Sequence, residues 1–352
     1  MPDHSYVFTA RDLKGKGKDA RFIAEPGDIR FLKVPTQFKG GKLVAGYSPQ
    51  HVVPGSQWFE EVADLADGLK DATVERPGHV LVFVHGYNND IKLVHKRQVQ
   101  LQQDLAAEGF HGLVVAFDWP SDDSTLNYLE DRWDAAEVAL KLVTHGIEPL
   151  AARQRAGCDL NVHLLGHSTG AFVIMEAFAA AQKSKKLFKS DWRVAQVGFI
   201  GGDVSRDSLS ASSDWAQPLY SRVMRVTNWS NGYDDVLAVS NAKRLGVSPR
   251  AGRVGLPSPP HAKSVNVDCS PFFKELDPDD QPAFGTFCHS WHIGNPVFAR
   301  DLALTLEGRI DRRDIPTRRL DPTRGLVLQD APRPEQEPAW LAERADEVRR
   351  PR

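Results

Sequence analysis

Residues 161–178 read NVHLLGHSTGAFVIMEAF, a short apolar run, a glycine-flanked serine and then a second apolar run. Gly166, Ser168 and Gly170 form the pattern G-x-S-x-G. The first run is typical of a buried strand, and the second is apolar almost all round, like a helix buried behind a sheet. A serine on such a strand-to-helix turn has a strained backbone, and flanking glycines relieve the crowding. The pattern predicts that Ser168 is an exposed nucleophile at the end of a strand.

Apolar runs alternate with amphipathic runs on both sides of this motif. Strands are expected at residues 79–85, 113–118, 161–165, 194–202, 222–229 and 262–267, and helices at 91–105, 131–149, 171–181 and 296–307. Strands that are apolar on both faces and alternate with helices predict an α/β fold, with a mostly parallel central sheet and helices on both faces. Ligands of such folds bind at the carboxyl ends of the strands, where Ser168 lies.

The same pattern divides the chain into three regions. Residues 1–77 are expected to form an N-terminal extension with edge strands, one of them at 31–34, and a helix. Residues 78–308 carry the regular alternation and Ser168, and are expected to be the catalytic domain. Residues 309–352 are rich in charge and proline, which predicts a C-terminal tail with one short amphipathic turn rather than a further domain.

Composition argues against several classes of function. A net charge of −2 over 352 residues leaves no electrostatic footprint for nucleic acid. No apolar run approaches the length of a membrane span, and the N-terminus has no apolar signal segment. Three widely spaced cysteines, Cys158, Cys269 and Cys288, suggest neither a disulfide framework nor a zinc site. We therefore expect a reducing, cytoplasmic compartment.

A serine nucleophile needs a general base. Three histidines follow Ser168 in the regular part of the chain, His261, His289 and His292. His261 precedes the last predicted strand, which is the wrong end of the sheet. The other two lie in CHSWHIGNP, between the last strand and the last helix, where a loop can bend over the serine. We favour His289 as the base and keep His292 as the alternative.

The base in turn needs an orienting carboxylate. This acid is expected after the strand that ends at Trp229, where the sequence WSNGYDDV offers Asp234 and Asp235. Two adjacent carboxylates usually divide into one that points inward and one that is solvated, and we choose Asp234 as the inward one. Asp235 and Asp203, which follows the preceding strand, are the alternatives.

Two backbone amides are expected to form an oxyanion hole. The residue after the nucleophile, Thr169, supplies one of them. The other is expected from the loop HGYNND after strand 79–85, where Gly86 permits a sharp turn and the amide of Tyr87 is the expected donor. His85 is expected to brace this loop through hydrogen bonds.

Taken together, these motifs resemble the α/β-hydrolase superfamily. In chain order they are VLVFVHGYNND, VVAFDWPSD with NYLEDR, LLGHSTG, Asp234 followed by Leu237 and Ser240, and HSW with NPVFARDL. More narrowly, they resemble a bacterial family of serine hydrolases of largely uncharacterised function. The resemblance covers residues 78–308. It implies that Ser168, Asp234 and His289 occupy the triad positions, although YDDV stands where that family usually has a single aspartate.

The resemblance also implies the position of a pocket. Trp119, Pro120, Asn127 and Tyr128 fall on the pocket-side loop of the family, and we expect Trp119, Tyr128 and His167 to line the substrate pocket. The expected reaction is hydrolysis of a small-molecule carboxylic ester with a short to medium acyl chain, with no metal and no organic cofactor. Acyl transfer, thioester or amide hydrolysis on the same triad, and a non-catalytic binding module of the same fold, are the alternatives.

Overall fold

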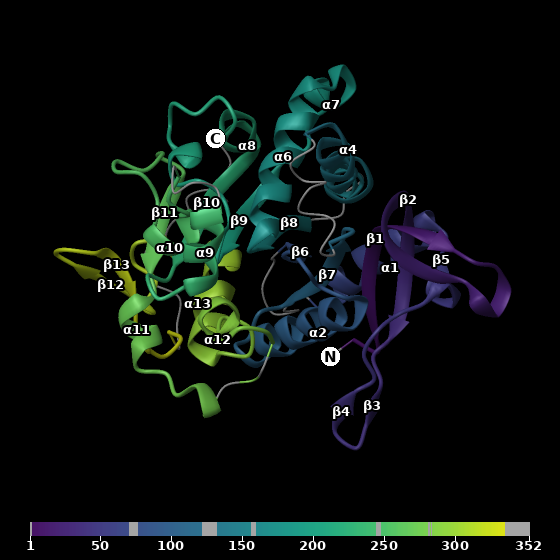
Figure 1. Cartoon of the computed structure of the whole chain (residues 1–352), viewed down its shortest axis with the longest axis horizontal. Coiled ribbons are helices and arrows are strands. Elements are labelled where there is room, and N and C mark those ends of the chain that lie inside the picture. The colour runs from purple at the N-terminus through teal and green to yellow at the C-terminus, as the bar shows by residue number, and fades with distance from the viewer. Residues whose placement is uncertain are drawn as a thin grey trace, which may run out of the picture.

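The computed structural model describes residues 2–69, 77–121, 132–155, 160–243, 248–280, 282 and 284–334. Within them, one sheet of 11 strands has the order β12-β13-β11-β10-β9-β8-β6-β7-β1-β2-β5, and β3 and β4 form a separate pair (Figure 1). All neighbours between β1 and β13 are parallel, and the antiparallel neighbours lie at the two ends. The predicted α/β fold with a mostly parallel sheet is confirmed.

The strands have the following bounds: β1 (His4–Lys14), β2 (Arg21–Pro35), β3 (Phe38–Lys39), β4 (Lys42–Leu43), β5 (Val52–Val53), β6 (Gly78–Val84), β7 (Gly112–Asp118), β8 (Leu160–His167), β9 (Val194–Ile200), β10 (Val223–Ser230), β11 (Ser264–Asp268), β12 (Arg318–Asp321) and β13 (Gly325–Leu328). The six strands expected from apolar runs correspond to β6 to β11. β6 and β7 are buried along their whole length, because helices cover both faces of the sheet.

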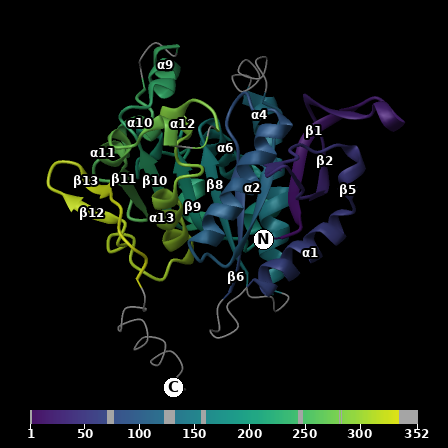
Figure 2. The ribbon, with the colours of Figure 1, turned by 90° about the horizontal axis from the view of Figure 1, so that it is seen from below.

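Helices cover both faces of the sheet (Figures 1 and 2). One core contains side chains of α1 (Gly55–Gly68), α4 (Arg132–Leu142), α5 (Glu148–Arg155), α6 (Thr169–Lys183), α7 (Lys185–Lys189) and α8 (Gln217–Arg222). The other contains side chains of α2 (Ile91–Ala107) and α13 (Pro296–Glu307). Four further helices are short: α9 (Asp235–Lys243), α10 (Ala251–Val254), α11 (Ser270–Lys274) and α12 (Phe287–Ser290). No helix in the described ranges combines the length and the hydropathy needed to cross a bilayer.

The long helix expected at residues 131–149 is interrupted, whereas α13 matches its prediction residue for residue. A π-helical turn, Val143–Ile147, separates α4 from α5. Pro149 lies just beyond this turn and has no amide hydrogen to donate to the preceding turn. A wider turn at such a point lets the chain continue in nearly the same direction.

Both ends of the described chain extend the central sheet. At the N-terminal side β1 pairs in parallel with β7, and Tyr6 and Phe8 are buried in the core. The edge strand expected at residues 31–34 lies within the longer β2. At the other end, β12 and β13 form a hairpin beside β11, where only a tail was expected. Each strand has only four residues, RRLD in β12 and GLVL in β13, which is too short to show an apolar period. Residues 335–352, with the expected amphipathic turn, lie outside the described ranges.

Candidate active site

Ser168 lies at the sharp turn between β8 and α6. Its φ of 55° and ψ of −123° are in a region that non-glycine residues rarely adopt. The Ser168 amide donates to the carbonyl of Ile200 at 3.0 Å, and the Ser168 carbonyl accepts from the amide of Asp203 at 3.0 Å. These bonds hold the strained turn against the end of β9. Ser168 keeps 8% of its surface accessible, so it is more covered than the sequence suggested.

His289 and Asp234 form a buried hydrogen-bonded pair. Nδ1 of His289, on α12, lies 2.7 Å from Oδ2 of Asp234. The other carboxylate oxygen accepts from the amide of Leu237 at 3.0 Å, so that Asp234 also caps the first turn of α9. A carboxylate opposite Nδ1 favours the tautomer with its hydrogen on that atom. Nε2 of His289 is then the nitrogen that can accept a proton.

The segment around Ile200 and Gly201 connects this pair to the serine. Ile200 accepts the hydrogen bond from the Ser168 amide. A methyl group placed on Gly201 would lie 3.1 Å from both Cε1 and Nδ1 of His289 and 3.4 Å from Oδ2 of Asp234. Ser168 and the His289–Asp234 pair therefore both adjoin the same short segment at the carboxyl end of β9.

The alternative acids have other partners. Asp203 lies 3.2 Å from Nε of Arg250 and accepts from the hydroxyl of Ser240 at 2.9 Å. Asp235 is on the surface, where its side chain is 85% exposed and 3.6 Å from Arg253. Only Asp234, of these three carboxylates, is shown bonded to His289.

The alternative base, His292, is fully buried away from these acids. Its ring stacks on Trp291, with centroids 4.2 Å apart, and meets the edge of Phe298. Neither ring nitrogen has a hydrogen-bond partner among the described residues. Burial lowers the pKa of His292 well below its usual value, so its neutral ring acts as part of the core.

The loop after β6 packs directly against Ser168. A methyl group on Gly86 would lie 2.7 Å from Cβ of Ser168, so no larger residue fits there. The side-chain amide of Asn89 donates to the carbonyls of Gly86 at 2.6 Å and of Tyr87 at 3.0 Å. Thr169 begins α6, and the first amides of a helix have no acceptor within the helix. The two amides expected to form the oxyanion hole thus belong to segments that adjoin Ser168.

A buried ionic network supports this loop through His85. Nδ1 of His85 lies 2.8 Å from the carbonyl of Gly86, and its Nε2 lies 3.1 Å from Asp118. Asp118, at the end of β7, pairs with Arg11 of β1 at 2.9 Å and accepts from Thr9 at 2.8 Å. Burial by itself would raise the pKa of Asp118, but Arg11 and His85 outweigh it and hold that pKa well below its usual range. The N-terminal strand therefore supports the loop beside Ser168.

Replacing Asp118 by asparagine is expected to lower the free energy of unfolding at pH 7 by about 3–5 kcal/mol, because the buried ion pair between Asp118 and Arg11 would be lost. The folded pKa of Asp118 lies below the unfolded value. Its contribution is thus present above about pH 4 and is lost as the pH falls through the folded pKa. Urea unfolding of both proteins at pH 7 and in acid measures the difference, with exposed Asp235→Asn as the matched control. An Asp118→Asn protein as stable as this control would contradict the expected role.

Two of the three residues that were expected to line the substrate pocket, Trp119 and His167, lie within the described structure. Trp119 is fully buried in the core, where its indole N–H donates to the carbonyl of His85 at 2.8 Å and its ring stacks on the imidazole. His167 is only 2% exposed and contacts Arg97 and His289. Tyr128 lies outside the described residues. The structure thus places Trp119 and His167 in the packing around the site rather than on an open wall.

Arg97 is a site-adjacent residue that the sequence analysis missed. It belongs to α2, is 3% exposed and hydrogen-bonds to residues of three separate segments of the chain. A signal was present, because Arg97 lies three residues after Val94 and four before Leu101 on the apolar stripe of this helix. A charged residue on such a stripe indicates a buried polar partner.

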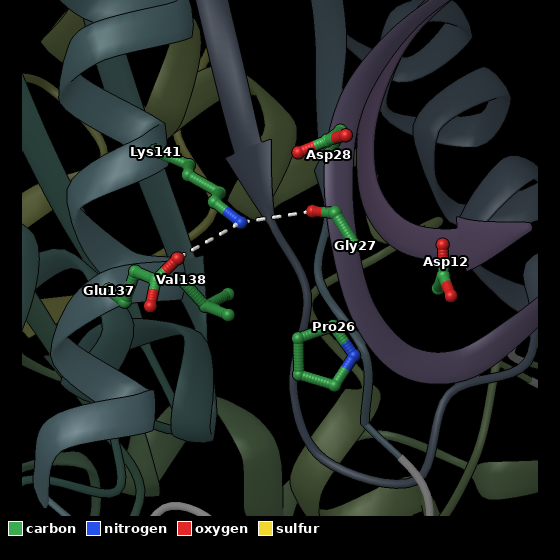
Figure 3. A pocket seen from close by; sticks show the side chains of 7 residues that line it. All are labelled: Asp12, Pro26, Gly27, Asp28, Glu137, Val138 and Lys141. Atoms are coloured by element: carbon green, nitrogen blue, oxygen red, sulfur yellow. Dashed lines mark hydrogen bonds and ion pairs between the residues drawn. The ribbon is translucent and has the colours of Figure 1, made fainter.

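A cavity of about 470 Å³ lies between the β1–β2 ribbon and α4, lined by Asp12, Pro26, Gly27, Asp28, Glu137, Val138 and Lys141 (Figure 3). Lys141 crosses toward the ribbon and donates to the carbonyl of Gly27 at 3.0 Å. None of the residues of the Ser168 site lines this cavity. Within the described ranges, no group of three or more His, Cys, Asp or Glu side chains is arranged to hold a metal ion.

Comparison with known proteins places the chain among hydrolases. A family model described as "Alpha/beta hydrolase of unknown function (DUF900)" matches residues 60–263, more than half of the chain. A cutinase-like protein from Cryptococcus sp. is similar in structure, with 15% identity, a TM-score of 0.33 and coverage of 65% of this chain and 95% of that chain. Trichoderma reesei cutinase is also similar in structure, with 11% identity, a TM-score of 0.30 and coverage of 72% of this chain and 90% of that chain. No curated protein matches the chain in sequence.

Proposed function

The chain belongs to the α/β-hydrolase family whose model matches residues 60–263, and from that premise we propose that it is a serine hydrolase of carboxylic esters. Ser168 is the nucleophile, His289 the general base and Asp234 the orienting carboxylate. The observation that carries this proposal is the 2.7 Å contact between Nδ1 of His289 and the fully buried Asp234, beside the segment that holds Ser168. The geometry leaves Nε2 of His289 as the proton acceptor.

In the proposed reaction His289 removes the hydroxyl proton of Ser168 as Oγ attacks the ester carbonyl. The amides of Tyr87 and Thr169 stabilise the negative oxygen of the tetrahedral intermediate, together with the positive end of α6. His289 then gives the proton to the departing alcohol, and an acyl group remains on Ser168. Water, activated by the same histidine, hydrolyses the acyl-enzyme. Asp234 holds the imidazole in one tautomer and stabilises its charged form.

No metal or organic cofactor takes part in these proposed steps, which need only groups that the chain supplies. The cytoplasmic location stays a prediction. The two described cysteines, Cys269 and Cys288, are free thiols, which supports it.

The substrate class can be tested with p-nitrophenyl esters of increasing acyl length, a thioester and an anilide. We expect kcat/KM to be highest for acetyl to octanoyl esters and to fall for palmitoyl, because the sequence has no insertion large enough for a cap domain that would enclose a long chain. Faster turnover of the palmitoyl ester would overturn the acyl-length proposal. A higher kcat/KM for the thioester or the anilide would reassign the leaving group on the same triad.

A further inference from the structure

One buried arginine, Arg97, connects the three segments that surround Ser168. One guanidinium nitrogen of Arg97, Nη1, donates to Oδ1 of Asn89 at 2.9 Å and lies 3.4 Å from Nδ1 of His167. Nε of Arg97 donates to the carbonyl of Phe284 at 3.1 Å. Nη2 of Arg97 donates to the same carbonyl and to the hydroxyl of Ser290, the latter at 3.2 Å. These partners come from the loop after β6, from the end of β8 and from the segment that carries His289.

His167 transmits one of these contacts to the base. Its Nε2 lies 3.1 Å from the carbonyl oxygen of His289, so this nitrogen must carry the hydrogen. Nδ1 is then an acceptor and receives the hydrogen bond from Arg97. Burial, and secondly the charge of Arg97, lower the pKa of His167 well below its usual value. The neutral ring therefore forms a directional chain from Arg97 through His167 to the backbone of His289.

Arg97 is not engaged in an ordinary structural ion pair through these contacts. All the acceptors named above are neutral carbonyl, amide, hydroxyl or imidazole groups. Burial lowers the pKa of Arg97 to about 10, which still leaves it charged at neutral pH. A buried cation that is held only by neutral groups costs stability compared with an apolar residue of similar shape. The planar guanidinium fork is, however, suited to acceptors in several directions at once, which a lysine cannot match.

Resting on the proposed function, we propose that Arg97 is a positioning residue, which holds the segment bearing His289, through Phe284, Ser290 and His167, in register with Ser168. It touches neither substrate nor the reacting atoms. Its fork contacts the segment on both sides of His289, and the bond to Asn89 ties this segment to the loop that carries Tyr87. Losing the fork would let the base and the oxyanion loop move independently of each other.

Arg97→Lys is the first test. We expect kcat to fall about 100-fold, since displacement of a catalytic group by about 1 Å has an effect of this size, while KM changes less than about threefold. Hydrogen–deuterium exchange of peptides spanning residues 284–290 should become faster. The matched control is Arg318→Lys, which alters another fully buried arginine, paired with Asp301 in a different part of the fold. This control should lower thermal stability without changing kcat or exchange in residues 284–290.

Two variants of His167 give a second test, in which glutamine is the conservative replacement and leucine is not. Glutamine has an amide oxygen and nitrogen that can replace the accepting and donating ring nitrogens, whereas leucine has neither. We expect His167→Gln to keep kcat within about tenfold of the wild type and His167→Leu to lose about 100-fold.

The outcomes separate this inference from the proposed function. Unchanged kcat and unchanged exchange at residues 284–290 in Arg97→Lys would overturn the positioning role, and so would losses that merely follow thermal stability, as in Arg318→Lys. Equal activities of the glutamine and leucine variants would also overturn it. Failure of the proposed function would instead appear as ester turnover of the wild-type protein that does not depend on Ser168.

Discussion

Ser168→Ala should lower ester turnover by about 10⁴–10⁶-fold and leave the fold intact. Loss of the hydroxyl removes the atom that forms the acyl-enzyme, so the remaining groups can only polarise the carbonyl. Alanine retains Cβ, and the turn with its φ of 55° is therefore neither more nor less strained than with serine. Initial rates with p-nitrophenyl butyrate measure the loss, and thermal unfolding checks the fold.

Covalent labelling gives this experiment an independent readout. A fluorophosphonate should modify the wild-type protein in the peptide that contains Ser168 and should leave the alanine variant unmodified. Wild-type rates in the variant would contradict the assignment of the nucleophile. Labelling at another residue would contradict it equally and would identify the nucleophile that replaces Ser168.

Asp234→Asn is expected to lower kcat by about 10⁴-fold. An asparagine can present its N–H₂ group to Nδ1 of His289, which would move the imidazole hydrogen to Nε2 and remove the proton acceptor. The side-chain oxygen would still cap α9 at the amide of Leu237, so the fold should be retained. Steady-state rates of the purified variant with the same ester measure the effect.

Three further variants serve as controls for Asp234→Asn. Asp235→Asn changes an exposed side chain, and His292→Phe keeps an aromatic ring at a position where neither imidazole nitrogen has a described partner. Both should retain kcat within about threefold, because surface changes and shape-conserving core changes have small effects. A loss in either variant as large as that in Asp234→Asn would reassign the acid or the base. A comparable loss in Asp203→Asn, with an unchanged thermal transition, would do the same for the acid.

The local pattern was sufficient for the central part of the fold. The runs at residues 79–85 and 113–118 are apolar on both faces, and only a sheet covered on both sides buries such strands. The bounds of α13 match the prediction residue for residue, and its ends carry local signals: Asn295 caps the first turn, Pro296 begins the helix and Gly308 ends it in a left-handed conformation. Patterns of this kind involve residues a few positions apart, so they can be recognised in the sequence itself.

The sequence pattern did not predict elements that are stabilised by residues far away in the chain. β1 is a member of the central sheet because it pairs with β7, more than 100 residues away, and because Arg11 meets Asp118 there. The hairpin of β12 and β13 depends on β11 and on the buried pair of Arg318 with Asp301. The π-helical turn between α4 and α5 departs from the single long helix that periodicity favoured for a local reason, the proline at position 149 just beyond it.

The sequence by itself therefore determined the parallel α/β architecture and the turn that carries Ser168, because both can be predicted from patterns among residues close together in the chain. Only the tertiary structure decided that His289 meets Asp234 while Asp203 meets Arg250, and that Arg97 connects the loop after β6, the end of β8 and the segment with His289. Those choices depend on how segments far apart in sequence approach one another to hydrogen-bonding distance, and hydrophobic periodicity carries no information about such approaches.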